Sequence, residues 1–196
     1  MRIVFVNRIA WPDAGATAIY LTDVAEACAA AGHEVHVVCG EAAYRGEEAT
    51  APPEATHAGV AYHRIPGARG EGLWRRGWAS LRFVRRARRA LRALPTPDVV
   101  VALTDPPFLD AAIGPVARRH GARVVHWWMD VYPDVLFAAD VLRPTGLFAR
   151  ALRSWMARTV RRADAVVVLG RAIHDRSALA KRPVGRSTSA AKRTSG

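Results

Sequence analysis

The chain has 196 residues, of which 51% are hydrophobic and 23% are charged, and it carries a net charge of +12. This length suits one sizeable domain, and no apolar run approaches the roughly 20 residues of a membrane-spanning helix. Two full-sized domains and an integral membrane protein are therefore not expected. The N-terminus lacks the cleavage region of a signal peptide, which predicts a cytoplasmic protein. The two cysteines, Cys28 and Cys39, are expected to be reduced and buried, and no His or Cys spacing resembles a zinc site.

Strand and helix patterns alternate along almost the whole chain. Strands are predicted, in chain order, at residues 2–6, 33–40, 60–65, 97–104, 122–129 and 164–170. Helices are predicted between them, at residues 17–31, 73–94, 107–121 and 145–163, and a further helix is expected to open at residue 171. Residues 41–59 contain two adjacent prolines and four glutamates without periodicity, which indicates a surface loop.

Several of these strands are continuous in Val, Leu and Ile, which is typical of strands that are buried on both faces. The sequence therefore predicts an α/β fold: a doubly wound, mainly parallel sheet with helices on both faces, Rossmann-like, in one domain over residues 1–180. Residues 181–196 are rich in Ser, Thr, Lys and Arg and are predicted to form a disordered basic tail. Ligands of such a sheet bind beyond the carboxyl ends of the strands, where the strand order reverses.

The positive charge is concentrated in two segments. Residues 72–97 contain eight arginines and no acid, and residues 181–196 add five basic residues and no acid, so the rest of the chain is near neutral. In the first segment, Leu81, Val84, Ala87, Leu91 and Leu94 form an apolar stripe. The arginines on the opposite face are Arg82, Arg85, Arg86, Arg89 and Arg92. With Trp74 and Trp78 before it, this helix suits an anionic lipid surface, and the alternative is an ordinary solvated face. Nucleic acid is not expected as a partner, because no recognised binding motif accompanies the charge.

Three segments at predicted strand ends contain candidate binding residues. Gly15, Ala16 and Thr17 lie where a helix begins, and free N–H groups there favour an anion such as phosphate; the alternative is a plain turn with Thr17 as the N-cap. Asp105 precedes two prolines and either caps the following helix or lies at the edge of a ligand cleft.

The third segment, VVHWWMDVYPD, ends the strand predicted at residues 122–129. Asp130 would follow that strand at its carboxyl end, which makes it the candidate catalytic residue. Successive strand residues point to opposite faces, so one of Trp127 and Trp128 can lie in the core while the other lines a cleft as a platform for a sugar or lipid. Trp128, Tyr132 and Asp134 are the substrate-binding candidates here. The alternative is two core tryptophans and an aspartate that caps a short helix.

Together these motifs resemble the N-terminal domain of glycosyltransferase family 4 enzymes of the GT-B fold. The resemblance covers about residues 2–177, in order. It is carried by RIVFVN, PDAGATAIYLTDVAEACAAAGHEVHVVCG, PDVVVALTDPPF, ARVVHWWMDVYPD and RRADAVVVLG. The chain looks most like the subset that builds bacterial surface polysaccharides and other glycoconjugates.

The resemblance implies two Rossmann-like domains that face each other across a cleft. The N-terminal domain would bind a glycan or lipid-linked acceptor and the C-terminal domain a nucleotide-sugar, with retention at the anomeric carbon and without a metal or other cofactor. Gly15, Ala16 and Thr17 match a loop that approaches the donor diphosphate, and Asp130 matches a polar residue near the reacting sugar. The basic face from Arg82 to Arg92 matches a surface that holds the enzyme or its acceptor at the membrane, peripherally on its inner face.

The family pattern is about twice as long as this chain, and its donor domain has no counterpart here. The chain is therefore expected to be a truncated or frame-disrupted product, or else a separate chain supplies the donor domain. Three hypotheses follow: the acceptor half of a sugar transferase, incomplete or inactive alone; a non-catalytic module that binds anionic membrane or a lipid-linked acceptor; and an inert fragment.

Overall fold

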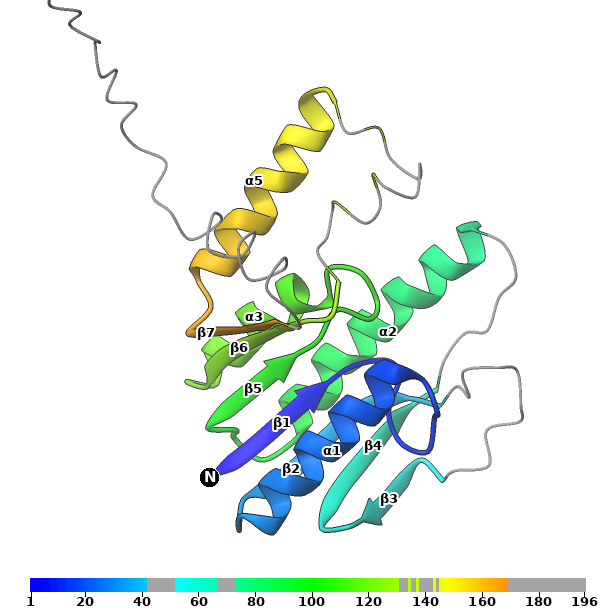
Figure 1. Ribbon diagram of the computed structural model, residues 1–196, viewed down its shortest axis with the longest axis vertical. Coiled ribbons are helices and arrows are strands. Elements are labelled where there is room, and N and C mark those ends of the chain that lie inside the picture. Colours follow the sequence, from blue (N-terminus) through cyan, green and yellow to red (C-terminus); the bar gives the residue numbers. More distant parts are fainter. Residues whose placement is uncertain are drawn as a thin grey trace, which may run out of the picture.

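A seven-stranded sheet forms the centre of the protein, and helices lie on both of its faces (Figure 1). The computed structural model describes residues 1–41, 52–66, 73–130, 134, 137, 143 and 145–168. Tyr132, the helix expected from residue 171 and the basic tail predicted at 181–196 lie outside the described residues.

The strands are β1 (Arg2–Val6), β2 (Glu34–Gly40), β3 (Glu54–His57), β4 (Val60–Ile65), β5 (Val99–Ala102), β6 (Arg123–Trp128) and β7 (Ala165–Val168). The described helices are α1 (Ala16–Ala30), α2 (Leu73–Ala93), α3 (Leu109–Arg119) and α5 (Leu147–Arg161). The strand order is β3-β4-β2-β1-β5-β6-β7, and every neighbouring pair is parallel except β3 and β4. The predicted doubly wound fold is confirmed, and the strand order reverses between β1 and β5.

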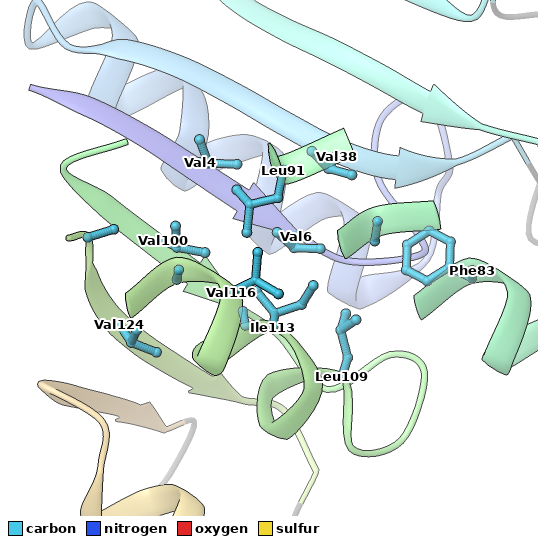
Figure 2. Close-up of a cluster of buried hydrophobic side chains, with 14 of the residues drawn as sticks. Val4, Val6, Val38, Phe83, Leu91, Val100, Leu109, Ile113, Val116 and Val124 are labelled. Atoms are coloured by element: carbon cyan, nitrogen blue, oxygen red, sulfur yellow. The ribbon is translucent and has the colours of Figure 1, made fainter. Parts of the chain in front are cut away.

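Each face of the sheet has its own hydrophobic core. On one face, Leu21 and Ala25 of α1 pack against Phe5 and Val37. The opposite face is covered by α2 and α3, whose Leu91, Ile113 and other apolar side chains meet Val4 and Val6 of β1 (Figure 2). Farther along this second face, Met156 and Val160 of α5 pack near Trp128. Successive residues of the valine-rich strands contribute to the two cores in turn. These strands are therefore apolar without a break.

The expected loop at residues 41–59 contains a strand that the sequence prediction missed. Glu54–His57 form β3, which pairs antiparallel with β4. The turn between the two strands is Ala58-Gly59, with φ of 46° and 80°, and two residues with positive φ are what a tight two-residue hairpin requires. An edge strand can be largely polar, which explains why Glu54 to His57 gave no apolar pattern.

A row of charged and imidazole groups runs across β1, β2, β4 and β3. Glu34 accepts hydrogen bonds from Arg2 and His36, which lower the pKa of its carboxyl to about 2. The ring nitrogens His36 Nδ1 and His63 Nε2 lie 3.0 Å apart. Burial, and then the neighbouring His36, lower the pKa of His63, while Glu54 opposes them. A hydrogen bond between these two ring nitrogens needs only one proton, so the contact between His36 and His63 favours the uncharged form of His63.

We expect the row to make the protein sensitive to mild acid. Because the pKa of His63 is lower in the folded state, the unfolded state binds protons more readily below about pH 6.5. The free energy of unfolding should therefore be fully retained above that pH and fall as the pH decreases toward 5. Urea denaturation at several pH values should show a flatter profile for His63→Gln. The control His33→Gln, in the turn after α1, should keep the wild-type slope; equal slopes for all three proteins would contradict the prediction.

Candidate functional site

An ion pair lies where the strand order reverses. Arg8 follows β1 and Asp105 follows β5, and Arg8 Nη2 is 2.6 Å from Asp105 Oδ1. Arg8 Nε donates a second hydrogen bond to Asp105 Oδ2 at 3.3 Å. The two side chains are 35% and 23% exposed, so the pair is open to solvent on one side. Parallel α/β sheets bind ligands at this position.

Backbone hydrogen bonds hold the loops around this pair. Arg8 N donates to Asp105 O, and Gly40 N, at the end of β2, donates to Arg8 O, both at 2.8 Å. A Cβ at residue 40 would lie 3.0 Å from Arg8 O, so the close approach of the two loops favours the glycine and a larger residue would force a small shift of the backbone. Asn7 is fully buried, and its Oδ1 accepts a bond from Asp105 N at 3.3 Å. Three strand ends are thereby joined into one surface.

Asp130 lies on the same edge of the sheet. It follows β6, which is parallel to β5 and two strand positions, about 10 Å, from β1. Burial raises the pKa of Asp105, Arg8 acts against this rise, and the charge of Asp130, which is exposed, adds a smaller increase. We call Arg8, Asp105 and Asp130 the switch-point cluster: one cation and two carboxylates that follow the neighbouring strands β1, β5 and β6 at the carboxyl edge of the sheet.

The β1–α1 loop reaches this edge and ends in the N-terminus of α1. Gly15 is the N-cap, with φ −71° and ψ 146°, and no side chain caps the helix. The alternative with Thr17 as N-cap is therefore wrong, since α1 already begins at Ala16. The backbone of Gly15 is extended and open to any residue type, so the glycine is not required by its φ. The uncapped first turn leaves N–H groups that can bind an anion.

The first part of the same loop is anchored by a buried arginine. Arg64 of β4 is 6% exposed, and its Nη2 donates to Trp11 O at 2.9 Å while its Nη1 donates to Pro52 O at 3.0 Å. Its guanidinium carbon lies 5.4 Å from the ring centroids of Trp11 and Tyr62. The Trp11 ring also stacks on the His57 ring, with the ring centroids 4.2 Å apart. The path of the loop toward Gly15 is thus fixed from β4 and β3.

The two tryptophans of β6 point to opposite faces, as expected, but both are buried. Trp127 belongs to the α1 side of the sheet and Trp128 to the α3 and α5 side. Trp128 is 3% exposed, and its Nε1 donates to Asp110 Oδ2 at 3.0 Å. The expectation that Trp128 lines the cleft is therefore corrected. Asp110 Oδ2 also lies 3.3 Å from His126 Nδ1. A buried polar cluster thus holds the carboxyl end of β6 against α3.

Asp134 and Asp105 are the two remaining candidates whose neighbours can be described. Asp134 Oδ1 lies 3.7 Å from Arg153 Nη2 of α5, and the guanidinium of Arg153 lies over the Phe137 ring at 4.5 Å. This ion pair gives Asp134 a structural partner. Asp105 does not cap α3, because the helix begins only at Leu109, after Phe108 in a left-handed conformation with φ of 65°.

The arginines of α2 face away from the core. They line a surface groove of about 450 Å³, and no described acidic side chain forms an ion pair with them. The lining residues are Arg82, Arg85, Arg86, Arg88, Arg89 and Arg92. Phe83, Ala87 and Leu91 are buried below. Leu81, expected in the core stripe, is 48% exposed and lies with Trp74 and Trp78, which are 86% and 65% exposed.

Two further findings bound the chemistry of the described residues. Within the part of the chain that the structure describes, no group of three or more His, Cys, Asp or Glu side chains is placed to hold a metal ion. None of the described helices is both long and apolar enough to cross a bilayer. The thiol of Cys39 is buried, which raises its pKa to about 12, and Cys28 is half-buried; both are free.

The sequence prediction missed Arg8, Asn7, Arg64 and Asp110. Arg8 and Asn7 directly follow the first strand, so their position at a strand end is visible in the sequence. Asp110 stands alone in the apolar run PFLDAAIGPVA, and a lone acid at a buried helix position is a usable signal. Nothing local indicates the partners, because the Arg8–Asp105 pair joins residues 97 positions apart.

Comparison with known proteins identifies a family and structures of similar fold. Residues 15–186 match the family described as Glycosyl transferase 4-like domain. The fold is similar to Glycyrrhiza uralensis UGT73P12 complexed with glycyrrhetinic acid 3-O-monoglucuronide, with a TM-score of 0.57 and 11% identity over 92% of this chain and 47% of that one. A second similar structure is alpha,alpha-trehalose 6-phosphate synthase from Burkholderia multivorans, with a TM-score of 0.47 and 17% identity over 84% of this chain and 38% of that one. No curated protein sequence matches the chain.

The chain thus spans less than half the length of each of these two solved structures. The first of them shows the fold, a Rossmann-like domain of the GT-B type. Since the family match covers most of the sequence, the chain belongs to the glycosyl transferase 4-like domain family.

Proposed function

We propose that this chain is the acceptor-side half of a retaining sugar transferase. It would act with a nucleotide-sugar and a glycan or lipid-linked acceptor in the synthesis of surface polysaccharide or another glycoconjugate. The domain that binds the nucleotide-sugar belongs, in this proposal, to a separate chain or to sequence outside these 196 residues. The chain alone would be inactive or nearly so.

The observation that carries the proposal is that the switch-point cluster and the open N-terminus of α1 follow strands of one parallel sheet at its carboxyl edge. The N–H groups of Gly15, Ala16 and Thr17 would meet the donor diphosphate, since a helix N-terminus stabilises an anion. Asp130, exposed at the end of β6, would accept a hydrogen bond from the transferring sugar and orient it. Asp105, held by Arg8, would bind an acceptor hydroxyl. Tyr132 and Asp134 follow Asp130 and remain substrate-binding candidates.

The expected reaction uses no metal and no other cofactor. In that case the positive charge that balances the diphosphate comes from the helix N-terminus and from the donor-binding domain. The switch-point cluster contributes its two carboxylates, which suit sugar hydroxyls better than phosphate.

Calorimetry with UDP-sugars and GDP-sugars tests this function, on the chain alone and with a co-encoded partner chain. Weak or no binding alone, and binding with sugar transfer in the presence of the partner, is the expected result. Asp130→Asn should reduce the transfer rate, whereas Asp23→Asn on the exposed side of α1 should not. Absence of both binding and transfer in either setting would count against the activity.

A second candidate function is a non-catalytic module that binds anionic membrane from the inner face. The groove of α2 favours it, because six arginines without a described acidic partner attract anionic headgroups. Each such residue near the surface adds about 1 kcal/mol, so replacing Arg85, Arg89 and Arg92 with Glu should weaken binding to acidic vesicles by more than about a hundredfold. Vesicle sedimentation measures this. Arg123→Glu, at the opposite edge of the sheet, should change little; equal binding to neutral vesicles would reject the idea.

A further inference from the structure

The carboxyl end of β6 extends beyond its pairing with β5. The ladder between these two strands ends where Ala102 lies opposite His126, although β6 continues to Trp128. Beyond His126, the described pairing of β6 is with β7 alone, at the edge of the sheet. Asp130 follows Trp128 by two positions and belongs to the switch-point cluster. Its position relative to Asp105 therefore depends on contacts other than the backbone hydrogen bonds between β5 and β6.

One buried side chain makes such a contact. Asp110 is the second residue of α3, and its Oδ2 accepts the hydrogen bond from Trp128 Nε1 at 3.0 Å. Its Oδ1 accepts a bond from Ala111 N at 2.8 Å, so both carboxyl oxygens are used in directed bonds. The side chain is 1% exposed, and hydrogen bonds are stronger at such low local dielectric. The last residue of β6 is thereby held to the first turn of α3.

The start of α3 is in turn tied to Asp105. Asp110 comes five positions after Asp105. Two of the intervening residues are prolines, whose rings fix φ at about −65°. Leu109 N donates to Pro106 O at 3.1 Å, which closes the short turn between them. The Asp105 backbone is also bonded to the residues that follow β1. Asp110 therefore links the loop that carries Asp105 to the strand that precedes Asp130.

The space beside this link is too small for a substrate. A cavity of about 70 Å³ between α3 and α5 is lined by Asp110, His126, Trp155 and neighbouring residues. Ligand pockets measure about 300–1,000 Å³. The buried carboxyl group therefore acts through the segments that it holds in place and not by binding a ligand itself.

We propose that Asp110 is a positioning residue, which holds Trp128 against α3 and thereby keeps Asp130 close to Asp105. The two carboxylates are near enough for the charge of Asp130 to act on Asp105. The effect on catalysis rests on the proposed function, in which Asp130 orients the transferring sugar and Asp105 binds the acceptor hydroxyl. A fixed spacing of the two carboxylates then holds the sugar and the hydroxyl at reacting distance, which speeds the transfer step. Donor binding is left to α1 and the donor domain.

The spacing is measured on the chain alone, by carbon-13 NMR titration of the Asp105 carboxyl group. Asp130→Asn removes the neighbouring charge, so the decrease that it causes in the pKa of Asp105 reports how close the two groups are. We expect this decrease to be about twofold smaller in a Trp128→Phe background, because the interaction of two charges weakens with distance and solvent screening. Trp128→Phe removes the hydrogen bond to Asp110, retains an aromatic ring and alters no charge.

Three further variants separate positioning from a general loosening of the fold. Asp110→Asn retains an oxygen that can accept the bond from Trp128, so it should keep more of the decrease than Asp110→Ala. Leu91→Val weakens the core beneath α2, away from this link, and should keep all of it. In a transfer assay with the co-encoded partner chain, Trp128→Phe should lower kcat roughly tenfold with little change in KM for the nucleotide-sugar.

The outcomes distinguish this inference from the proposed function. An unchanged decrease in both Trp128→Phe and Asp110→Ala, or an equal loss in Leu91→Val, would overturn the positioning role. So would a wild-type background in which Asp130→Asn leaves the pKa of Asp105 unaltered. A smaller decrease in the Trp128 and Asp110 variants alone supports the role. If the wild-type chain and its partner then transfer no sugar, the proposed function fails while the link between β6 and α3 stands.

Discussion

Replacing Asp110 with Ala is expected to lower the free energy of unfolding by about 3 kcal/mol, which is the upper end of the cost of leaving buried polar groups without a partner. Asp110 is 1% exposed and His126 is fully buried. The substitution would leave Trp128 Nε1 without its acceptor, and a buried unsatisfied donor alone costs about 1–3 kcal/mol. It would also remove the carboxylate from the first turn of α3, where the helix dipole favours it.

Urea denaturation with two comparison variants separates these contributions. Asp110→Asn retains one side-chain oxygen as an acceptor for Trp128, so we expect a smaller loss than for the Ala variant. Asp23→Ala, on the exposed side of α1, should change the free energy of unfolding by no more than about 0.5 kcal/mol. If Asp110→Ala were as mild as Asp23→Ala, the cluster of Asp110, His126 and Trp128 would not hold β6 to α3.

The same cluster explains a limit of the sequence prediction. Alternation along a strand placed Trp127 and Trp128 on opposite faces correctly. Which face stays open depends on what packs there, and α5 closes the Trp128 side with Met156 and Val160 from more than twenty residues along the chain. No local pattern contains that information, so the more deeply buried tryptophan was assigned to the cleft.

The layers of the fold were predictable because their cause is local. Continuous apolar runs such as IVFV and VVVA can only be buried on both faces, and the spacing of Phe83, Ala87 and Leu91 allows only a helix with one buried side. The β3 strand was not predictable in this way, since its four residues alternate in exposure without a large apolar side chain. In the structure, the strand is set by the two-residue turn at Ala58-Gly59, where the chain reverses from β3 into β4.

The site was predictable in its place but not in its contacts. Asp105 and Asp130 follow strands of one parallel sheet, so their common edge follows from the topology. The cap interpretation of Asp105 was wrong because α3 begins at Leu109, so Asp105 precedes the Phe108 N-cap by three residues. Arg8 supplies what the sequence could not show, a cation that meets Asp105 across the switch point.

That ion pair leads to the second large effect, which depends on pH. Arg8→Met is expected to cost about 1–3 kcal/mol at pH 7, because it leaves the Asp105 carboxylate poorly solvated and close to Asp130. The value stays near the lower end because both partners are partly exposed and the pair is screened by solvent. Asp105→Asn should cost less, since the Arg8 guanidinium that it leaves without this partner is 35% exposed and stays better solvated than the Asp105 carboxylate. The double variant should be more stable than Arg8→Met alone.

The pH profile of Arg8→Met has a definite sign. Burial already raises the pKa of Asp105, and removal of Arg8 takes away the charge that opposes this rise. The folded variant then binds a proton more readily than the unfolded chain, whose Asp pKa is about 3.9, so stability falls as the pH rises through the interval between the two values. Urea titrations should therefore show the deficit of Arg8→Met growing from about pH 4 to 7, and the deficit should vanish in the Asp105→Asn background. A deficit independent of pH in both backgrounds would mean that Arg8 acts through packing alone, and the carboxyl edge would then hold no charge pair of functional weight.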